Sequence, residues 1–287
     1  MKAWIRLLRP HQWIKSGFVF VGLLFGHGWS DSALVMQVLL AAAAFSLAAS
    51  AVYVGNDVVD CENDRQHPDK CRRPLASGAI GVQSALFLGV ACLLLAAVLA
   101  WLASPVVLGV ILAYLLLNVG YTLGLKHVVL LDVFIISAGF MLRLLAGTVG
   151  VGIAPSNWLL LCGLMVTLFL GFAKRRAELK ALDEDAVGHR RVLEDYDPVL
   201  LDKLIGVCAA ATIVSYSLYT VSPETVLMHG TDRLVATVPF VVYGMFRYLF
   251  LLHRRSGGGD PAAQLLTDRH LVVACCGWLG TTLLILA

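Results

Sequence analysis

The sequence predicts an all-α, polytopic membrane helix bundle, and its composition and its run of apolar segments are the two observations that predict it. Of the 287 residues, 59% are hydrophobic and only 14% are charged, whereas a soluble domain has roughly 25% charged residues. The mean hydropathy is +0.81. A soluble globule of this size could not hide so much apolar surface in one core. The composition therefore excludes a soluble globular domain, and it equally excludes a disordered chain.

The apolar segments predict nine transmembrane helices, because a spanning helix needs about 20 mostly apolar residues. These segments cover residues 13–29, 33–54, 81–103, 105–123, 128–149, 156–173, 204–222, 234–252 and 270–287. The first segment is the weakest of the nine because it contains Lys15. Pro105, Pro155 and Pro223 stand at predicted helix boundaries, where a missing backbone N–H costs least. The connections are short, so residues 1–287 are expected to form one transmembrane domain.

The basic residues gather in alternate connections, which lie on one side of the membrane in a nine-span bundle. The N-terminus and the loops 55–80, 124–127, 174–203 and 253–269 hold 18 of the 22 Lys and Arg residues, and the opposite loops hold only Arg233. By the positive-inside rule, the N-terminus and the long loops are expected in the cytoplasm and the C-terminus outside. The protein is thus predicted to be an integral protein of the cytoplasmic membrane. The formal net charge of +3 is too small to indicate a nucleic-acid partner.

Four charged residues fall inside the predicted spans: Lys15, Asp132, Arg143 and Arg247. A charge in lipid is costly, so each is expected to face the bundle interior or a wet cavity. Arg247 lies near a predicted cytoplasmic end and can also extend to the interface. For Arg143, a structural partner and a ligand remain equally open.

The most informative stretch is N-D-V-V-D-C-E-N-D, residues 56–64, at the end of the second apolar segment. At about 100° per residue, Asp57, Asp60 and Asp64 fall within about 60° of one another on a helix face. Three carboxylates so placed repel one another unless a cation sits between them, and hard oxygen ligands suit Mg²⁺. Mg²⁺ bound by carboxylates usually completes its shell with substrate phosphates and water. The three aspartates are therefore predicted to bind Mg²⁺ and to be the catalytic residues.

This N-D-x-x-D-x-x-x-D pattern, at the cytoplasmic end of the second of nine helices, resembles the first signature of the UbiA-type membrane prenyltransferases. The resemblance covers nearly the whole chain through topology, although its specificity rests on this motif. It implies a helix bundle around a cytoplasm-facing cavity, in which the Asp motif binds a diphosphate through Mg²⁺. It also implies a transferase whose leaving group is a diphosphate.

The sequence departs from the superfamily pattern after the sixth segment, where a second Asp-rich motif is usual. Residues 172–180 read F-A-K-R-R-A-E-L-K, without a D-x-x-x-D. Lys174 and Glu178 are four residues apart and share a helix face, with Arg175 alongside. The consecutive acids of 183–185 cannot line one helix face. Two or more cations with a single carboxylate suit a donor that carries an extra phosphate.

With that departure, the chain is similar to one branch of the superfamily, the decaprenyl-phosphate phosphoribosyltransferases. The matching stretches are residues 8–15, the H-P-x-K-x-R-R-P run of 67–74, Tyr121 through Lys126 to Asp132, Gly139 to Arg143, 173–180, 259–261 and 267–269. This branch transfers 5-phosphoribosyl from phosphoribosyl diphosphate (PRPP) to a polyprenyl phosphate. Its product supplies lipid-linked arabinose for cell-envelope polysaccharides, so the resemblance implies an envelope role.

The resemblance and the side-chain chemistry together give the following expected roles. Asp57, Asp60 and Asp64, with Asn56, bind Mg²⁺ and the diphosphate. Lys70, Arg73, Lys174 and Arg175 are candidates for the diphosphate and the 5-phosphate, because charged, forked donors recognise phosphate well. Glu178 could orient a cation or accept a hydrogen bond from a ribose hydroxyl, Lys126 and Tyr121 could reach a phosphate, and Lys15 is the candidate for the lipid phosphate. The expected cofactor is Mg²⁺, the expected partners are PRPP, the lipid and the bilayer, and oligomer formation stays open.

Two other functions stay open at this point. An aromatic prenyltransferase, of the type that uses 4-hydroxybenzoate, would share the fold and take an isoprenyl diphosphate. The missing second carboxylate pair argues against it. A transporter would use intramembrane charges such as Asp132 and Arg143 as a pathway. The gathering of nearly all polar signals on one face disfavours it, because alternating access needs a site reachable from both sides.

Overall fold

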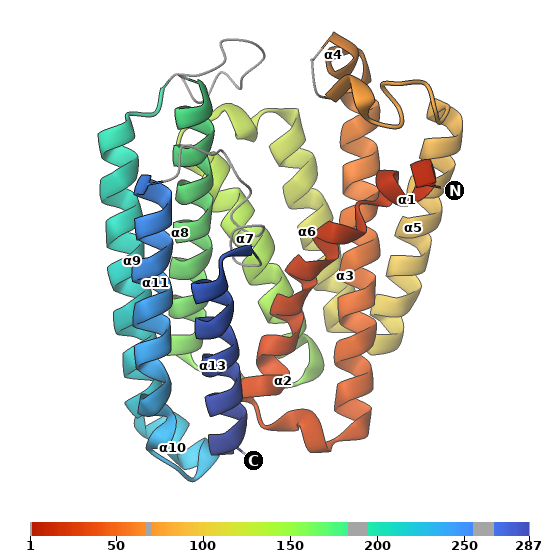
Figure 1. Ribbon diagram of the computed structural model, residues 1–287. Helices are drawn as coiled ribbons and strands as arrows, with labels where there is room; N and C mark the ends of the chain where they lie inside the picture. The colour runs from red at the N-terminus through yellow and green to blue at the C-terminus, as the bar shows by residue number, and fades with distance from the viewer. Residues whose placement is uncertain (1, 67–69, 183–194, 255–266, 287) are drawn as a thin grey trace. The chain divides into compact units, whose positions relative to one another are not determined.

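The computed structural model describes residues 2–66, 70–182, 195–254 and 267–286, and within these ranges the chain forms helices and contains no strand (Figure 1). Eight helices are long and apolar enough to cross a membrane by length and composition. They are α3 (Ser32–Val59), α5 (Val82–Ala103), α6 (Pro105–Leu123), α7 (Leu131–Ala146), α8 (Asn157–Leu182), α9 (Pro198–Val221), α11 (Val238–Arg254) and α13 (Arg269–Leu286). Each overlaps one of the segments predicted from hydropathy, which confirms the all-α membrane fold.

The first predicted segment, 13–29, is not a regular α-helix, so the predicted count of nine is only approximate. After α1 (Lys2–Leu8), the chain forms the 3-10 helix η1 (Pro10–Phe20), α2 (Val21–Phe25) and the 3-10 turn η2 (Gly28–Ser30). Of this stretch, η1 packs against α3, and the chain moves away from α3 toward α2 (Figure 1). Glycine has a low α-helix propensity, and this stretch uses glycine for backbone contact. A Cβ on Gly22 would overlap the carbonyl of Gly147, and one on Gly147 would overlap the carbonyl of Val19.

The contacts divide the chain into two compact units. Unit 1 comprises residues 1–125 and 139–154, and unit 2 comprises residues 126–138 and 155–287. The helix α7 contributes its first half to unit 2 and its second half to unit 1. The prediction of one domain over 1–287 stays a prediction.

Small side chains form the core of unit 1. Ala41, Ala44 and Ala48 of α3 are completely buried, as is Ala100 of α5, and these residues belong to one apolar cluster. In lipid, small residues let two helix backbones approach closely, and van der Waals packing then holds the helices together. This packing fixes the end of α3, which carries the Asp motif.

The core of unit 2 is built from larger side chains on α8, α9 and α11. Phe169, Leu201 and Ile205 are at most 1% exposed, and the Phe169 ring meets the Tyr248 ring edge-on with centroids 5.2 Å apart. The first half of α7 packs against α8 closely enough that a Cβ on Gly171 would lie 2.6 Å from Cγ1 of Val133. This contact fixes the start of α7 beside the end of α8, where the polar residues of unit 2 lie.

The intramembrane arginine of unit 1, Arg143, has structural partners. Its Nη1 donates to the carbonyl of Gly139 at 2.8 Å and its Nη2 to the hydroxyl of Tyr114 at 3.1 Å. The rings of Phe45, Tyr114 and Phe140 lie 4.8 to 5.6 Å from its guanidinium carbon. Contacts of a cation with aromatic faces offset part of the cost of burying the charge. The sequence left open whether Arg143 has a structural partner or binds a ligand, and the described residues provide structural partners.

Candidate active site

The Asp motif lies where α3 passes into the short helix α4 (Cys61–Gln66). The α-helix ends at Val59, and Asp60 occupies the C-cap position with φ −88° and ψ 2°. The backbone hydrogen bonds nevertheless continue across this junction, from the Asp60 N–H to Asn56 at 2.9 Å and from the Asp64 N–H to Asp60 at 2.8 Å. The helical spacing used to predict a shared face therefore holds through the cap.

Two of the three aspartates meet at a single guanidinium. Nη1 of Arg73 lies 3.2 Å from Oδ1 of Asp57 and 2.6 Å from Oδ2 of Asp64. The side chains of Asp57 and Asp64 are only 3% and 6% exposed, and that of Arg73 is 30% exposed. Asp60 is half-buried and forms no ion pair with another residue in the described part of the chain. The geometry thus places a cation between Asp57 and Asp64, as the mutual repulsion of carboxylates requires.

A second arginine, which sequence reasoning did not assign to the site, contacts the same aspartate. Nη2 of Arg9 lies 2.6 Å from Oδ1 of Asp57. The guanidinium of Arg9 also stacks over the ring of Tyr53, with 4.9 Å between its carbon and the ring centroid. Arg9 lies 48 residues before Asp57, and only its place next to Pro10 in the 8–15 stretch could have drawn attention to it.

Asn56 belongs to the Asp motif on α3, and Tyr121 lies on α6 next to a residue that contacts Asn56. Oδ1 of Asn56 accepts a hydrogen bond at 3.0 Å from the hydroxyl of Thr122, which joins the two helices. Tyr121, the neighbour of Thr122, is half-buried. Lys70 opens the 3-10 turn η3 (Lys70–Arg72) just before Arg73, and it is half-buried as well. Unit 1 therefore brings together the Asp motif, Asn56 and the basic turn that follows it.

The donor set of unit 1 fits a divalent cation that shares its ligands with a substrate. Among the described residues, no three His, Cys, Asp or Glu side chains converge closely enough to hold a metal by themselves. The buried carboxylates of Asp57 and Asp64, however, each direct one oxygen to the Arg73 guanidinium. Mg²⁺ is commonly held by one or two carboxylates together with substrate phosphates and water. Two carboxylates beside cationic side chains match that pattern.

Lys15 lies elsewhere in unit 1, on η1. It is half-buried, and the next residue, Ser16, shares a 3.0 Å hydrogen bond with Ser46 of α3. Trp13 donates its indole N–H to Ser50 of α3 at 2.9 Å. These bonds fix the segment that carries Lys15 along α3.

Unit 2 holds a buried ion-pair network at the start of α7 and the end of α8. Nε of Arg175 donates to Oδ2 of Asp132 at 2.7 Å, and Nη1 of Arg175 contacts the carboxylate of Glu178. The side chains of Arg175 and Asp132 are 1% and 0% exposed. Arg175, predicted to bind a phosphate, thus contacts two carboxylates, and a phosphate bound there would share its guanidinium with Asp132 and Glu178.

Tyr196 completes this network. Its hydroxyl donates to Oδ1 of Asp132 at 2.7 Å and accepts the N–H of Leu130 at 2.8 Å. Burial, together with the hydrogen bond to the Asp132 carboxylate, raises the pKa of Tyr196 above its ordinary value, so the hydroxyl stays protonated and donates. Sequence reasoning missed Tyr196 because it is 64 residues from Asp132 and belongs to no motif.

The other predicted residues of unit 2 are more accessible. Glu178 is 32% exposed, Lys174 is half-buried on α8, and Lys126 is half-buried in the 3-10 turn η4 (Leu125–His127). The motif positions 67–69, the acids of 183–185, the arginines at 190 and 191 and the 259–261 stretch lie outside the described residues.

Arg247, the last of the intramembrane charges, pairs with Asp268 at the start of α13. Its Nε and Nη2 contact the two oxygens of Asp268 at 3.2 and 2.8 Å. Oδ1 of Asp268 also accepts the N–H of Leu271 at 3.1 Å and so caps α13. The hydrogen bond from Arg247 lowers the pKa of Asp268 to about 2.

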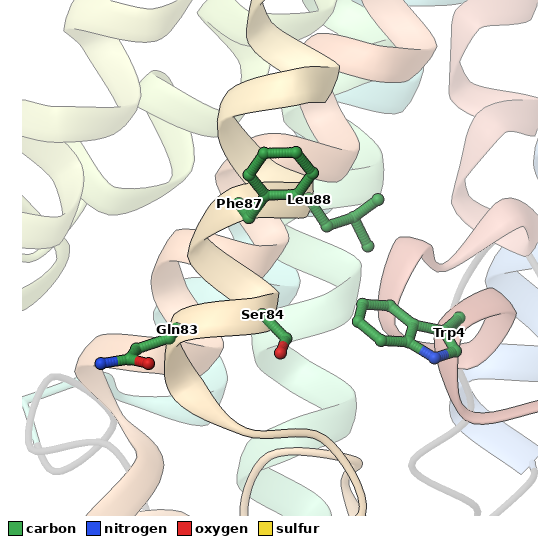
Figure 2. Close-up of a pocket in the computed structure, with 5 residues that line it drawn as sticks. All are labelled: Trp4, Gln83, Ser84, Phe87 and Leu88. Atoms are coloured by element: carbon green, nitrogen blue, oxygen red, sulfur yellow. The ribbon is translucent and has the colours of Figure 1, made fainter.

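A surface depression of about 540 Å³ lies apart from these residues, on unit 1 (Figure 2). Trp4 of α1 lines one side of it and Gln83, Ser84, Phe87 and Leu88 of α5 line the other, with Ser84 and Leu88 pointing toward Trp4 (Figure 2). Phe87 is 78% exposed on a spanning helix. No predicted site residue lines this depression, so it is not the candidate active site.

The chain resembles known proteins along nearly its whole length. Residues 16–267 match the model of the UbiA prenyltransferase family. A decaprenyl-phosphate phosphoribosyltransferase of Corynebacterium glutamicum is 34% identical over 286 residues, which cover 96% of this chain and 84% of that protein. One of Mycobacterium tuberculosis is 31% identical, with 96% of this chain and 92% of that protein covered.

The fold is also that of solved structures. A UbiA homolog from Archaeoglobus fulgidus, bound to GPP and Mg²⁺, superposes with a TM-score of 0.73 over 99% of both chains at 17% sequence identity. The structural match shows the fold, and the family model together with the curated relatives covers most of the sequence. This chain is therefore a member of the UbiA prenyltransferase family.

Proposed function

We propose that this protein transfers 5-phosphoribosyl from PRPP to a polyprenyl phosphate such as decaprenyl phosphate, and releases diphosphate. The observation that carries the proposal is the pair of buried carboxylates, Asp57 and Asp64, joined by Arg73. A diphosphate bound through a metal needs carboxylates and guanidinium donors in one place. The names of the curated relatives at 31% and 34% identity supply the class of donor and acceptor.

The reaction needs charge stabilisation more than proton transfer. The bond between the anomeric carbon and a diphosphate oxygen breaks, and its electron pair leaves with the diphosphate. A phosphate oxygen of the lipid forms the new bond to that carbon, and direct displacement predicts inversion. The lipid phosphate is already ionised at neutral pH because its second pKa is near 6. Arg73 and Lys70 are assigned to the leaving diphosphate, whose charge they would stabilise as it develops.

Asp57 and Asp64 are the residues that would hold Mg²⁺, with Asn56 and Asp60 as further oxygen donors. When bound, the ion would offset the negative charge of the leaving group. The two carboxylates suit Mg²⁺ because both are buried and both contact one positively charged group, the Arg73 guanidinium. Their Arg73 partner is 30% exposed, so it can turn toward a phosphate.

In unit 2, Lys174 and Lys126 are assigned to the phosphates of the donor and Glu178 to a ribose hydroxyl. This assignment rests on the chemistry of these residue types and on their accessibility. Arg175 is assigned a positioning role, because its guanidinium holds the Glu178 carboxylate while Asp132 holds the guanidinium.

Lys15 and Tyr121 are assigned to the phosphate of the polyprenyl acceptor. The protein lies in the membrane with eight long apolar helices, so a lipid acceptor can reach it from the bilayer. With the N-terminus and the basic loops in the cytoplasm, as the charge distribution predicts, the Asp motif takes PRPP from the cytosol.

The test is a transfer assay with the purified protein in detergent. Mg²⁺, labelled PRPP and decaprenyl phosphate are supplied, and the label is followed into the lipid phase. We expect lipid-linked phosphoribose that disappears with EDTA and in Asp57→Asn. The matched control is Asp31→Asn, because Asp31 only caps the far end of α3 through the Ala33 N–H at 2.9 Å.

A parallel reaction distinguishes the nearest alternative. Farnesyl diphosphate and 4-hydroxybenzoate replace PRPP and the lipid phosphate. Transfer in this second mixture and none in the first would contradict the phosphoribosyl donor while retaining the family. Full phosphoribosyl transfer by Asp57→Asn would contradict the assignment of the Asp motif.

A further inference from the structure

The turn that carries Arg9 has an unusual backbone. Arg9 has φ 51° and ψ 58°, in the left-handed region, where residues other than glycine are uncommon. It also precedes Pro10, and a residue before proline is normally extended. A strained backbone conformation of this kind persists only where the surrounding contacts hold it in place, and such conformations are concentrated at functional sites.

The surroundings of this turn fix Arg9 against α3. The hydroxyl of Ser50 donates to the carbonyl of Leu8 at 2.7 Å, and the indole N–H of Trp13 donates to that hydroxyl at 2.9 Å. Leu7 is completely buried. The residues on both sides of Arg9 are therefore tied to the same residue of α3, which brings the guanidinium to Asp57.

Two guanidinium groups then converge on one oxygen. Oδ1 of Asp57 lies 2.6 Å from Nη2 of Arg9 and 3.2 Å from Nη1 of Arg73. Arg73 has a second acceptor in Asp64, but Asp57 is the one carboxylate that Arg9 contacts within the described chain. The two guanidinium groups therefore balance two carboxylates, and with Arg73 shared between both aspartates the contribution of Arg9 falls on Asp57 alone.

Apart from the Asp57 contact, the Arg9 guanidinium stacks over the Tyr53 ring, and a stacked guanidinium keeps its N–H donors in its own plane. Of its side-chain nitrogens, Nη2 alone donates a hydrogen bond to a described residue, and the side chain is 23% exposed. A guanidinium presents five N–H donors in a fork that matches phosphate oxygens. Arg9 can therefore meet a phosphate from its accessible side.

We propose that Arg9 binds a phosphate of the diphosphate donor, and that it neutralises Asp57 until metal and donor arrive. This inference rests on the proposed diphosphate site. A divalent cation held by Asp57 would repel the Arg9 guanidinium and weaken its contact with that carboxylate. Arg9 then moves to the phosphate. Metal and diphosphate binding thus favour each other, and by linkage each strengthens the other equally.

The proposal predicts changes of opposite sign in one variant. Arg9→Gln removes the cation that competes with the metal, so the affinity for Mn²⁺ alone, used as a probe for Mg²⁺, should rise about threefold or more. The same change removes a phosphate ligand, so labelled diphosphate in excess Mg²⁺ should bind about tenfold more weakly. A residue that only supports the fold would weaken both.

The experiment uses the full chain in detergent, with free Mn²⁺ measured by electron paramagnetic resonance and diphosphate by equilibrium dialysis. Arg6→Gln is the matched control, because Arg6 lies three residues earlier on α1, is exposed and forms no ion pair with the described residues. It should leave both affinities unchanged. Unchanged or weaker Mn²⁺ binding in Arg9→Gln, or unchanged diphosphate binding, overturns the proposal.

A second variant covers the case in which Arg9→Gln does not fold. Arg9→Lys keeps the charge but loses the fork, so Mn²⁺ binding should stay within about twofold of wild type while diphosphate binding weakens about threefold. Unchanged diphosphate binding would again overturn the proposal. Because both measurements use only metal and diphosphate, they give the same answer whichever group the enzyme transfers, and a failure of the phosphoribosyl assay is distinguishable from a failure here.

Discussion

Asp132 and Asp202 both pair with arginines of α8, but burial makes the two pairs unequal. The Asp132–Arg175 pair is at most 1% exposed, whereas Asp202 and Arg176 are 33% and 24% exposed. Removing one partner of a buried pair costs about 3–5 kcal/mol, and without Asp132 the buried Arg175 would keep only Glu178, which is 32% exposed, as a carboxylate partner. We therefore expect Asp132→Asn to lower the free energy of unfolding by about that amount, measured by denaturant unfolding in detergent.

Asp202→Asn is the matched control for that prediction. A partly exposed pair contributes about 0–1 kcal/mol because water screens it. Equal losses in the two variants would contradict the view that burial decides the strength of these pairs.

Lys174 gives a prediction about substrate binding. If it contacts a phosphate of PRPP, Lys174→Ala should raise the KM for PRPP about tenfold, while the KM for the polyprenyl phosphate changes less than about twofold. Steady-state kinetics with each substrate varied in turn measures both. Lys180→Ala, a half-buried lysine on the same helix, should change neither. A change confined to the lipid would mean that the two substrates are assigned the wrong way round.

At the residue scale, short-range spacing was predictive and long-range contacts were not. Asp57 and Asp64 could be paired from the sequence, since seven residues along a helix return to nearly the same face. Arg9 and Tyr196 reach their partners across 48 and 64 residues. Such contacts depend on how helices pack, which periodicity does not encode.

Among the elements, the 3-10 stretch before α3 gives the sharpest stability prediction. A Cβ on Gly147 would overlap the carbonyl of Val19, and overpacking of this kind costs about 1–3 kcal/mol or more. We expect Gly147→Ala to lower the apparent Tm in detergent clearly. Gly109→Ala is the control, because a Cβ on Gly109 meets nothing within 4 Å. Equal Tm values for the two variants would contradict the close packing of the Gly147 backbone against the Val19 backbone.

The cap of α13 gives a pH-dependent prediction. The pKa of Asp268 is lowered to about 2, against about 3.9 in an unfolded chain. A lowered pKa stabilises the fold above the unfolded value and loses that contribution as the pH falls toward the folded value. Asp268→Asn should therefore lower the apparent Tm at pH 6, and the difference from wild type should shrink at pH 3. A difference that is independent of pH would contradict the ion pair with Arg247.

The element scale also shows why eight spans could be predicted and the first could not. A long apolar run specifies a spanning helix because lipid leaves the backbone no other way to satisfy its hydrogen bonds. In residues 10–25, backbone-to-backbone contacts through Gly22 and Gly147 accompany a 3-10 helix. That contact depends on the end of α7, more than 100 residues later in the sequence, so local hydropathy could not reveal it.

At the scale of the whole molecule, the last prediction concerns orientation. The N-terminus and four alternate connections hold 18 of the 22 Lys and Arg residues, and such an excess stays on the cytoplasmic side. Alkaline phosphatase fused after residue 287 should therefore be active, and green fluorescent protein fused there should not fluoresce. The same two reporters fused after Gly230, in the predicted outward connection between α9 and α11, should behave alike. Fluorescence of the C-terminal fusion would mean that residues 10–25 do not cross the membrane, because eight crossings return the chain to its starting side.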